Sequence, residues 1–107
     1  MARSANEIDE IVKHTIRLAA DRLPLTAVYL FGSYSDGTPD ENSDIDIAIF
    51  SPAADNMPLS EKIEFLADIR LAIGAEIELH LFGDKCFQNA RPGNIYGHIL
   101  VTGRKMA

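Results

Sequence analysis

Two aspartates separated by one residue are the side chains in this 107-residue chain best placed to do chemistry. Asp44 and Asp46 lie in residues 43–50, where polar or small residues alternate with aliphatic ones. Such alternation predicts a β-strand, so both carboxylates point to one face, roughly 7 Å apart along the backbone. Like charges at that spacing repel unless a cation lies between them. The pair therefore predicts a site for a hard divalent cation, Mg²⁺ or Mn²⁺.

A third carboxylate follows on another predicted strand, residues 75–82, whose acidic side chains again share one face. We expect Glu78 to be the third metal ligand or a base, with Glu76 on the same face as the alternative. Two divalent cations about 4 Å apart can hold the attacking and leaving oxygens of a phosphoryl transfer. His80 lies on this face as well, and both a substrate contact and a plain surface position remain open for it.

Gly32 and Ser33 come directly after a short apolar segment, residues 26–31, that predicts a buried strand. A glycine there lets the backbone approach a ligand, and a short helix starting near residue 33 would offer amide donors to phosphate. The Ser33 hydroxyl adds one more hydrogen-bonding group. Phosphate binding combined with metal binding predicts a nucleoside triphosphate ligand. The simpler interpretations are a strand-ending turn, a helix cap and a solvated acidic strand face.

The remaining pattern predicts the elements that position these residues. Residues 6–23 predict a helix that ends before Pro24, and residues 60–73 predict a second helix with a capped first turn at Ser60 and an end at Gly74. Residues 51–58 read as a polar connection, and residues 94–101 predict a short helix with Ile95, Ile99 and Leu100 facing inward and an interruption at Gly97. We expect one α+β (α/β) domain over residues 1–107, a small mixed β-sheet with helices packed on it.

Composition restricts the partners and the compartment. Sixteen acidic against ten basic residues give a net charge of −6, which provides no strong signal for nucleic-acid binding. The single cysteine, Cys86, cannot form an internal disulfide and fits a reducing compartment. No apolar run approaches the roughly 20 residues that span a bilayer, and no signal-peptide core follows the N-terminus. We therefore expect a cytoplasmic protein without a membrane partner.

The spacing of these motifs resembles a known family. Gly32-Ser33, ten further residues and then Asp44-Ile45-Asp46 is similar to the signature of the polymerase β-like nucleotidyltransferases, and the short chain resembles their minimal members. Tyr34 after the serine and Ser43 before the first acid are typical flanking residues. The resemblance covers roughly residues 6–82.

The resemblance implies the polymerase β-like fold and the transfer of a nucleotide, AMP from ATP, to an acceptor hydroxyl with Mg²⁺ or Mn²⁺. It implies that Asp44 and Asp46 bind metal and that Gly32 and Ser33 hold phosphates. The third carboxylate then falls on Glu78, where the family usually has aspartate. Glu76 is the reserve position.

One residue departs from the family pattern, and the family's partners suggest two functions. Many members carry arginine where this chain has Asp36, and an anion there would repel a triphosphate. Minimal members are often antitoxins for a helical HEPN-type toxin and either adenylylate it or neutralise it by contact. The two hypotheses are therefore an adenylyl-transferring enzyme and a non-catalytic antitoxin or binding module. A second subunit, another copy or a partner, is one way to supply the acceptor pocket that so short a chain lacks.

Overall fold

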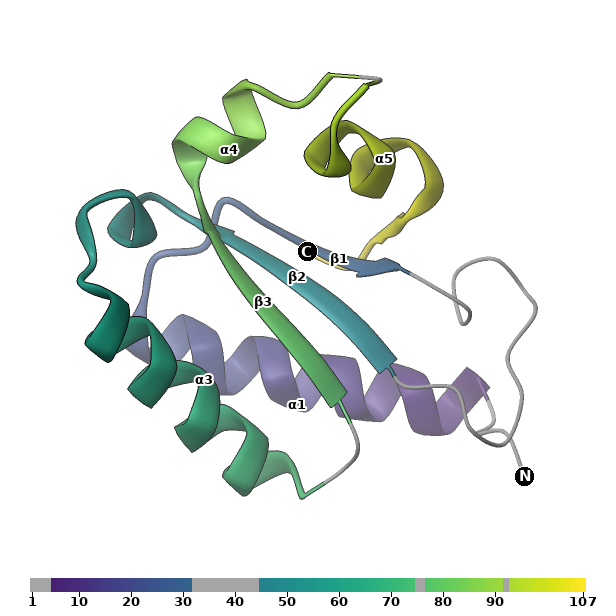
Figure 1. Ribbon diagram of the computed structural model, residues 1–107. Helices are drawn as coiled ribbons and strands as arrows, with labels where there is room; N and C mark the ends of the chain where they lie inside the picture. Colours follow the sequence, from purple (N-terminus) through teal and green to yellow (C-terminus); the bar gives the residue numbers. More distant parts are fainter. Residues whose placement is uncertain (1–4, 32–44, 75–76, 92) are drawn as a thin grey trace.

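The computed structural model describes residues 5–31, 45–74, 77–91 and 93–107 (Figure 1). In chain order its elements are α1 (Ala5–Arg22), β1 (Ala27–Phe31), β2 (Ile45–Ser51), the 3₁₀ helix η1 (Pro52–Asn56), α3 (Leu59–Ile73), β3 (Ile77–Gly83), α4 (Asp84–Gln88), α5 (Ile95–Thr102) and β4 (Arg104–Lys105).

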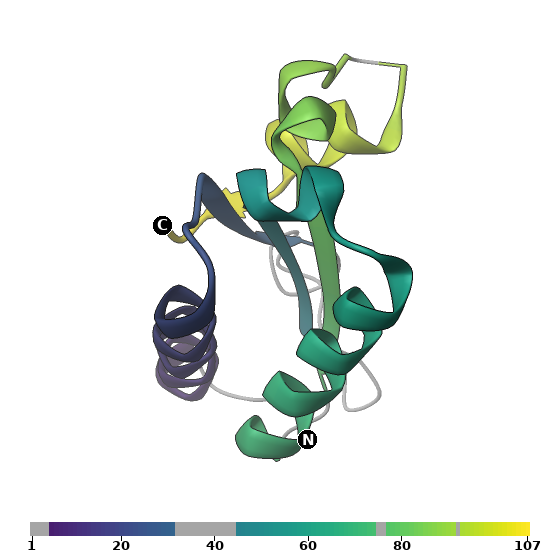
Figure 2. The ribbon, with the colours of Figure 1, turned by 90° about the vertical axis from the view of Figure 1, so that its left-hand side faces the viewer.

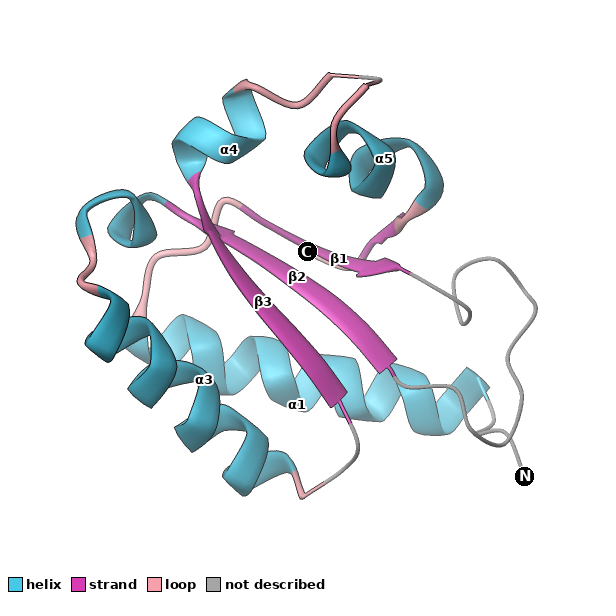
Figure 3. Cartoon of the chain, in the orientation of Figure 1, coloured by secondary structure: helices cyan, strands magenta, loops and turns pink. Residues whose placement is uncertain are grey.

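The strands form a four-stranded mixed sheet in the order β3-β2-β1-β4 (Figure 3). β1 pairs antiparallel with β2 and with β4, whereas β2 and β3 are parallel. Parallel neighbours need a crossover connection, and α3 provides it between β2 and β3. The predicted mixed sheet with packed helices is confirmed.

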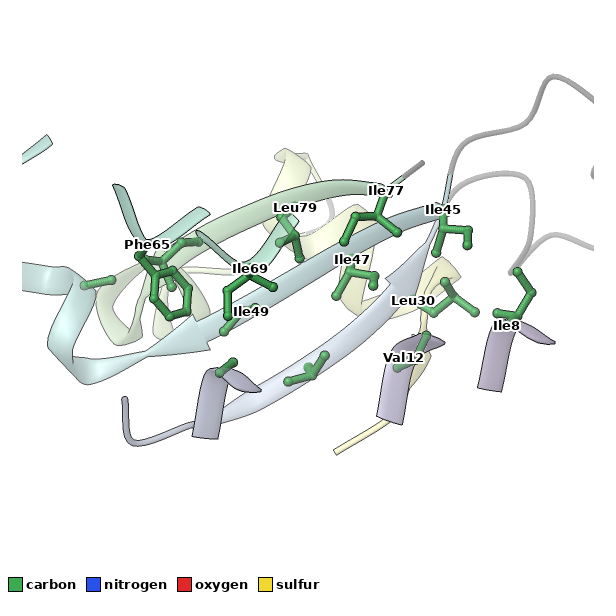
Figure 4. Close-up of a cluster of buried hydrophobic side chains, with 14 residues drawn as sticks. Ile8, Val12, Leu30, Ile45, Ile47, Ile49, Phe65, Ile69, Ile77 and Leu79 are labelled. Atoms are coloured by element: carbon green, nitrogen blue, oxygen red, sulfur yellow. The ribbon is translucent and has the colours of Figure 1, made fainter. Parts of the chain in front are cut away.

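One face of the sheet is covered by α1 and α3, which lie side by side in Figure 2. Helical spacing places Ile8, Val12 and Ala19 on the buried side of α1, and Phe65 and Ile69 are the buried residues of α3. They pack against the aliphatic residues of the strands (Figure 4), namely Val28, Leu30, Ile45, Ile47, Ile49, Ile77, Leu79 and Leu81. This is the main hydrophobic core.

The opposite face is covered in part by α4 and α5 (Figure 1). The core on this face is largely aromatic. Phe50 and Ile99 are fully buried there, and several half-buried residues surround them: Tyr29, Phe31, Phe82, Cys86, Phe87, Tyr96 and Leu100. The start of α4 is held by Asp55 of η1, whose carboxylate accepts hydrogen bonds from the backbone amides of Asp84 at 3.2 Å and Lys85 at 3.1 Å. A distant carboxylate therefore caps a helix whose own N-cap, Gly83, has no side chain.

Most predicted elements are confirmed to within two residues, among the residues that the structure describes. The first helix ends at Arg22, before Pro24, and Gly74 ends α3 in the left-handed conformation with φ 66°. Of the residues described, no helix is long and apolar enough to cross a membrane.

Some predictions are wrong in detail. Ser60 does not cap the second helix, because α3 begins at Leu59 with Pro58 as an N-cap that makes no side-chain hydrogen bond. Ile95 is 60% exposed rather than inward, since it is the first residue of α5 and Asn94 caps the helix by accepting a bond from the Gly97 amide at 2.9 Å. Gly97 lies within α5 and does not interrupt it. The elements η1, α4 and β4 were not predicted.

Gly97 gives a test of how closely α5 approaches the preceding loop. A Cβ atom at this position would lie 1.8 Å from the carbonyl oxygen of Arg91, which is backbone and cannot swing away. Replacing glycine by alanine inside a helix normally stabilises it by about 1 kcal/mol. We expect Gly97→Ala instead to lower the free energy of unfolding by about 1–3 kcal/mol, because the added methyl group would overpack this contact. Chemical denaturation measures the change.

Gly93→Ala is the matched control, because a Cβ atom at Gly93 has nothing within 4 Å. We expect it to change the free energy of unfolding by less than about 0.5 kcal/mol. Equal stability of the two variants would contradict the close packing of α5 on the loop.

Candidate active site

The centre of the candidate site is the pairing of two carboxylate residues on adjacent strands. In the parallel register of β2 and β3, Asp46 lies directly beside Glu78. Neighbouring strands run about 4.8 Å apart, so the two side chains leave the sheet next to each other. Asp46 is half-buried on a central strand, and Glu78 is exposed on the edge strand. The predicted sharing of one sheet face by these acids is confirmed.

Phe31 extends this pair into a row across three strands. Phe31 is the last residue of β1, and it is paired with Asp46 on the side of β2 opposite to Glu78. The flanking isoleucines, Ile45 and Ile47, belong to the core under α1 and α3, so the row Phe31–Asp46–Glu78 points to the opposite face. Both acids lie near the N-terminal ends of the parallel strands β2 and β3. Because β1 runs antiparallel to them, its C-terminal end lies beside these two strand starts.

The next row contains His80, and aromatic rings surround it. Its ring lies 5.4 Å from that of Phe31 and stacks at 6.0 Å on that of Phe82, measured between centroids. Ala48, the residue of β2 between His80 and Tyr29, is fully buried, and its small side chain leaves space for Phe31 and His80 to meet above it. His80 is thus half-buried among rings and is not a plain surface residue, whereas its contact with a substrate stays a prediction.

This aromatic surface beside the acids was not predicted from the sequence. The signal was present, because positions 29, 31, 50 and 82 are aromatic and each falls on the face of its strand that carries the acids. Toward α5 the surface continues from Phe82 to Tyr96, with ring centroids 5.2 Å apart. A hydrogen bond to Cys86, its charge interaction with that thiol and burial together raise the pKa of Tyr96 above its ordinary value.

The other predicted site residues lie outside the described residues. They are Gly32, Ser33, Asp36, Asp44 and Glu76. In the chain, Gly32 follows Phe31 directly and Asp44 comes two residues before Asp46. Within the described ranges, no group of three or more His, Cys, Asp or Glu side chains is arranged to hold a metal ion. Of the three predicted metal ligands, the described residues include Asp46 and Glu78.

Comparison with known proteins decides which family has this arrangement. The family model for polymerase β nucleotidyltransferases matches residues 6–100. The chain belongs to this family. The resemblance inferred from the spacing of the glycine, serine and aspartates is therefore confirmed.

Individual proteins and structures are also similar to this chain. Protein adenylyltransferase MntA of Shewanella oneidensis is 42% identical over 65 residues, which cover 60% of this chain and 45% of that protein. A chain from a toxin–antitoxin complex crystallised with AMP-PNP is 29% identical, with a TM-score of 0.62 over 89% of this chain and 71% of its own length. A nucleotidyltransferase structure from Sulfolobus solfataricus, 22% identical, has the same fold with a TM-score of 0.62 over 79% and 78% of the two chains. The match thus spans less than half of the Shewanella protein.

The pairing of Asp46 with Glu78 predicts a cost in stability. Like charges directly opposite each other in a sheet are destabilising, by a few tenths of a kcal/mol up to about 1 kcal/mol. We expect Glu78→Gln to raise the free energy of unfolding by about that amount in low salt without divalent cations. Because the repulsion is screened, the gain should shrink when the salt concentration rises.

Glu64→Gln is the control. Glu64 is an exposed glutamate on α3, and this substitution removes the same charge from the chain. We expect it to give no comparable gain. If denaturant titrations show Glu78→Gln to be less stable than the wild-type protein in low salt, the two carboxylates do not repel each other as the register indicates.

Proposed function

We propose that this chain transfers AMP from ATP to a hydroxyl group of a partner protein, with Mg²⁺ or Mn²⁺. The observation that carries the proposal is the register of Asp46 beside Glu78 in a chain of the polymerase β nucleotidyltransferase family. Support comes from two relatives, one named a protein adenylyltransferase and one found in a toxin–antitoxin complex with AMP-PNP. We propose a HEPN-type toxin in the cytoplasm as the partner.

The proposed ligands fit a hard divalent cation. Asp46 and Glu78 offer carboxylate oxygens, which Mg²⁺ and Mn²⁺ prefer over nitrogen or sulfur, and Asp44 would be the third donor. Bound divalent cations would neutralise charge on the triphosphate and on the leaving pyrophosphate. Gly32 and Ser33 are the proposed phosphate contacts, placed directly after Phe31 in the chain.

The proposed AMP transfer needs only ATP and the acceptor hydroxyl as reactants. The acceptor hydroxyl oxygen forms a bond to the α-phosphorus of ATP. The bond between this phosphorus and the oxygen that bridges it to the β-phosphorus breaks, and pyrophosphate leaves. The acceptor proton moves to a carboxylate, for which we propose Glu78 because it is exposed at the sheet edge. Asp46, fixed between two strands, holds its position throughout.

The role of Asp46 is testable with labelled ATP. The purified chain, a divalent cation and the candidate partner are incubated together, and label transferred to the partner is measured. We expect Asp46→Asn to lower the transfer rate by more than about a hundredfold, because one oxygen ligand loses its charge. Asp21→Asn, an equally conservative change at an exposed position near the end of α1, should retain the wild-type rate.

A nucleotide-independent measurement complements the assay. Mn²⁺ should raise the melting temperature of the wild-type protein and of Asp21→Asn, and should have a smaller effect on Asp46→Asn. Equal labelling of the partner by the wild-type protein and Asp46→Asn would show that this carboxylate is not part of the catalytic site.

A second function, neutralisation of the toxin by contact alone, is favoured by one residue. In the sequence, Asp36 lies between the proposed phosphate-binding and metal-binding residues, and an anion near a triphosphate would weaken its binding. The double variant Asp44→Asn with Asp46→Asn separates the two functions in cells that express the toxin. Under the enzymatic proposal we expect protection to be lost at equal antitoxin levels, whereas preserved protection would favour contact.

A further inference from the structure

The row of residues next to the acids consists of Tyr29 on β1, Ala48 on β2 and His80 on β3. It lies two residues, or about 7 Å, along the strands from the row that contains Asp46. Ala48 is fully buried, and the rings of His80 and Phe31 meet above it with 5.4 Å between their centroids. The acids therefore adjoin rings that are built over a central alanine.

The rings of Phe31, His80 and Phe82 form one surface, called here the ring surface. His80 stacks on Phe82 with an angle of 14° between their planes, and Phe82 in turn packs against Tyr96 of α5. The three residues of the ring surface are half-buried, so each retains some accessible area. Rings that are already held by their neighbours lose little freedom when a planar ligand stacks on them.

The course of the proposed AMP transfer determines which part of the nucleotide meets the ring surface. In phosphoryl transfer the attacking and leaving oxygens lie roughly in line through the phosphorus. Glu78, the proposed proton acceptor, is exposed on an outer strand of the described sheet. Phe31, at the other end of the same row, directly precedes the proposed phosphate contacts in the chain. The line from acceptor to pyrophosphate therefore runs across the strands.

The ribose and base extend from the α-phosphorus to the side of this line. Asp46 and Glu78 are the second residues of β2 and β3, and Phe31 is the last residue of β1. The described sheet therefore continues from this row in one direction, which leads onto the ring surface. A ribose can bridge the separation of about 7 Å between the two rows.

We propose that the ring surface binds the nucleoside of the ATP substrate, with the base stacked against the ring of His80. The assignment rests on the proposed AMP transfer. Stacking suits this surface because every nucleobase presents a π-face to an aromatic ring. An acceptor that approaches Glu78 from the outer side of β3 leaves the ring surface free for the base. His80 is then a substrate-binding residue, two positions after Glu78 on the same strand.

Binding of AMP-PNP and of inorganic tripolyphosphate to the full chain, each with Mn²⁺, tests the nucleoside contact. Isothermal titration calorimetry measures both dissociation constants. We expect His80→Ala to raise the dissociation constant for AMP-PNP by about 5- to 100-fold, because stacking on the base is lost. The dissociation constant for tripolyphosphate should stay unchanged, because tripolyphosphate has no base.

Three further variants accompany this measurement. His80→Phe keeps a flat ring and should retain most of the affinity for AMP-PNP. His80→Gln fills similar space without a ring and should weaken AMP-PNP binding as His80→Ala does, which gives a second test should the alanine variant fold poorly. His98→Ala is the matched control, since His98 is an exposed histidine of α5, and it should bind both ligands as the wild-type protein does.

Four outcomes would overturn the nucleoside site. They are equal AMP-PNP affinity of His80→Ala and the wild-type protein, equal weakening of both ligands by His80→Ala, an effect of His80→Ala confined to the KM for the partner protein, and wild-type binding of AMP-PNP no tighter than that of tripolyphosphate. The labelling assay tests the proposed function separately. AMP-PNP binding that depends on His80, without label transfer to a partner, would refute AMP transfer and leave the nucleoside site in place.

Discussion

The parallel register between β2 and β3 is the constraint on which the site depends. It places Asp46 beside Glu78. A shift of one residue would turn Glu78 toward α3 and bring Leu79 to the site face, because strand side chains alternate. The register is fixed mainly by burial, since Ile77, Leu79 and Leu81 of β3 must meet the core under both helices. The repulsion between the two acids is small compared with the cost of exposing these three aliphatic side chains, at about 1.5–3 kcal/mol each.

The two faces of the sheet have different side chains, and that difference produces the site. The helix-covered face is aliphatic and tightly closed. On the other face, in the part of the chain that the structure describes, α4 and α5 pack on the aromatic cluster around Phe50, and the row containing Asp46 and Glu78 begins at Phe31, at the border of this cluster. Ala48 separates these regions: its small side chain lets Phe31 and His80 pack together, so the acids have a rigid aromatic border.

Periodicity was enough to predict the elements that depend on local pattern. The strands with alternating residues, the helix before Pro24 and the end of α3 at Gly74 could all be read from neighbouring residues, and the face of Asp46 and Glu78 followed from the same pattern. The features that were missed depend on contacts distant in sequence. α4 begins where Asp55, 29 residues earlier, accepts the Asp84 amide, and the position of Gly97 is set by the backbone of Arg91. The aromatic border needed the strand order, which periodicity does not give.

The environments of the two described acids suit different roles. Asp46 has a short side chain, is half-buried and is paired with residues on both neighbouring strands, so its carboxylate has little freedom. Glu78 has one more methylene group, is exposed and lies on an outer strand of the described sheet. A fixed carboxylate is suited to hold a cation, and a more mobile one at the edge is suited to reach an acceptor hydroxyl on another protein. The exposed position of Glu78 on the outer strand therefore favours, for the proposed transfer, an acceptor that approaches from the β3 side of the sheet.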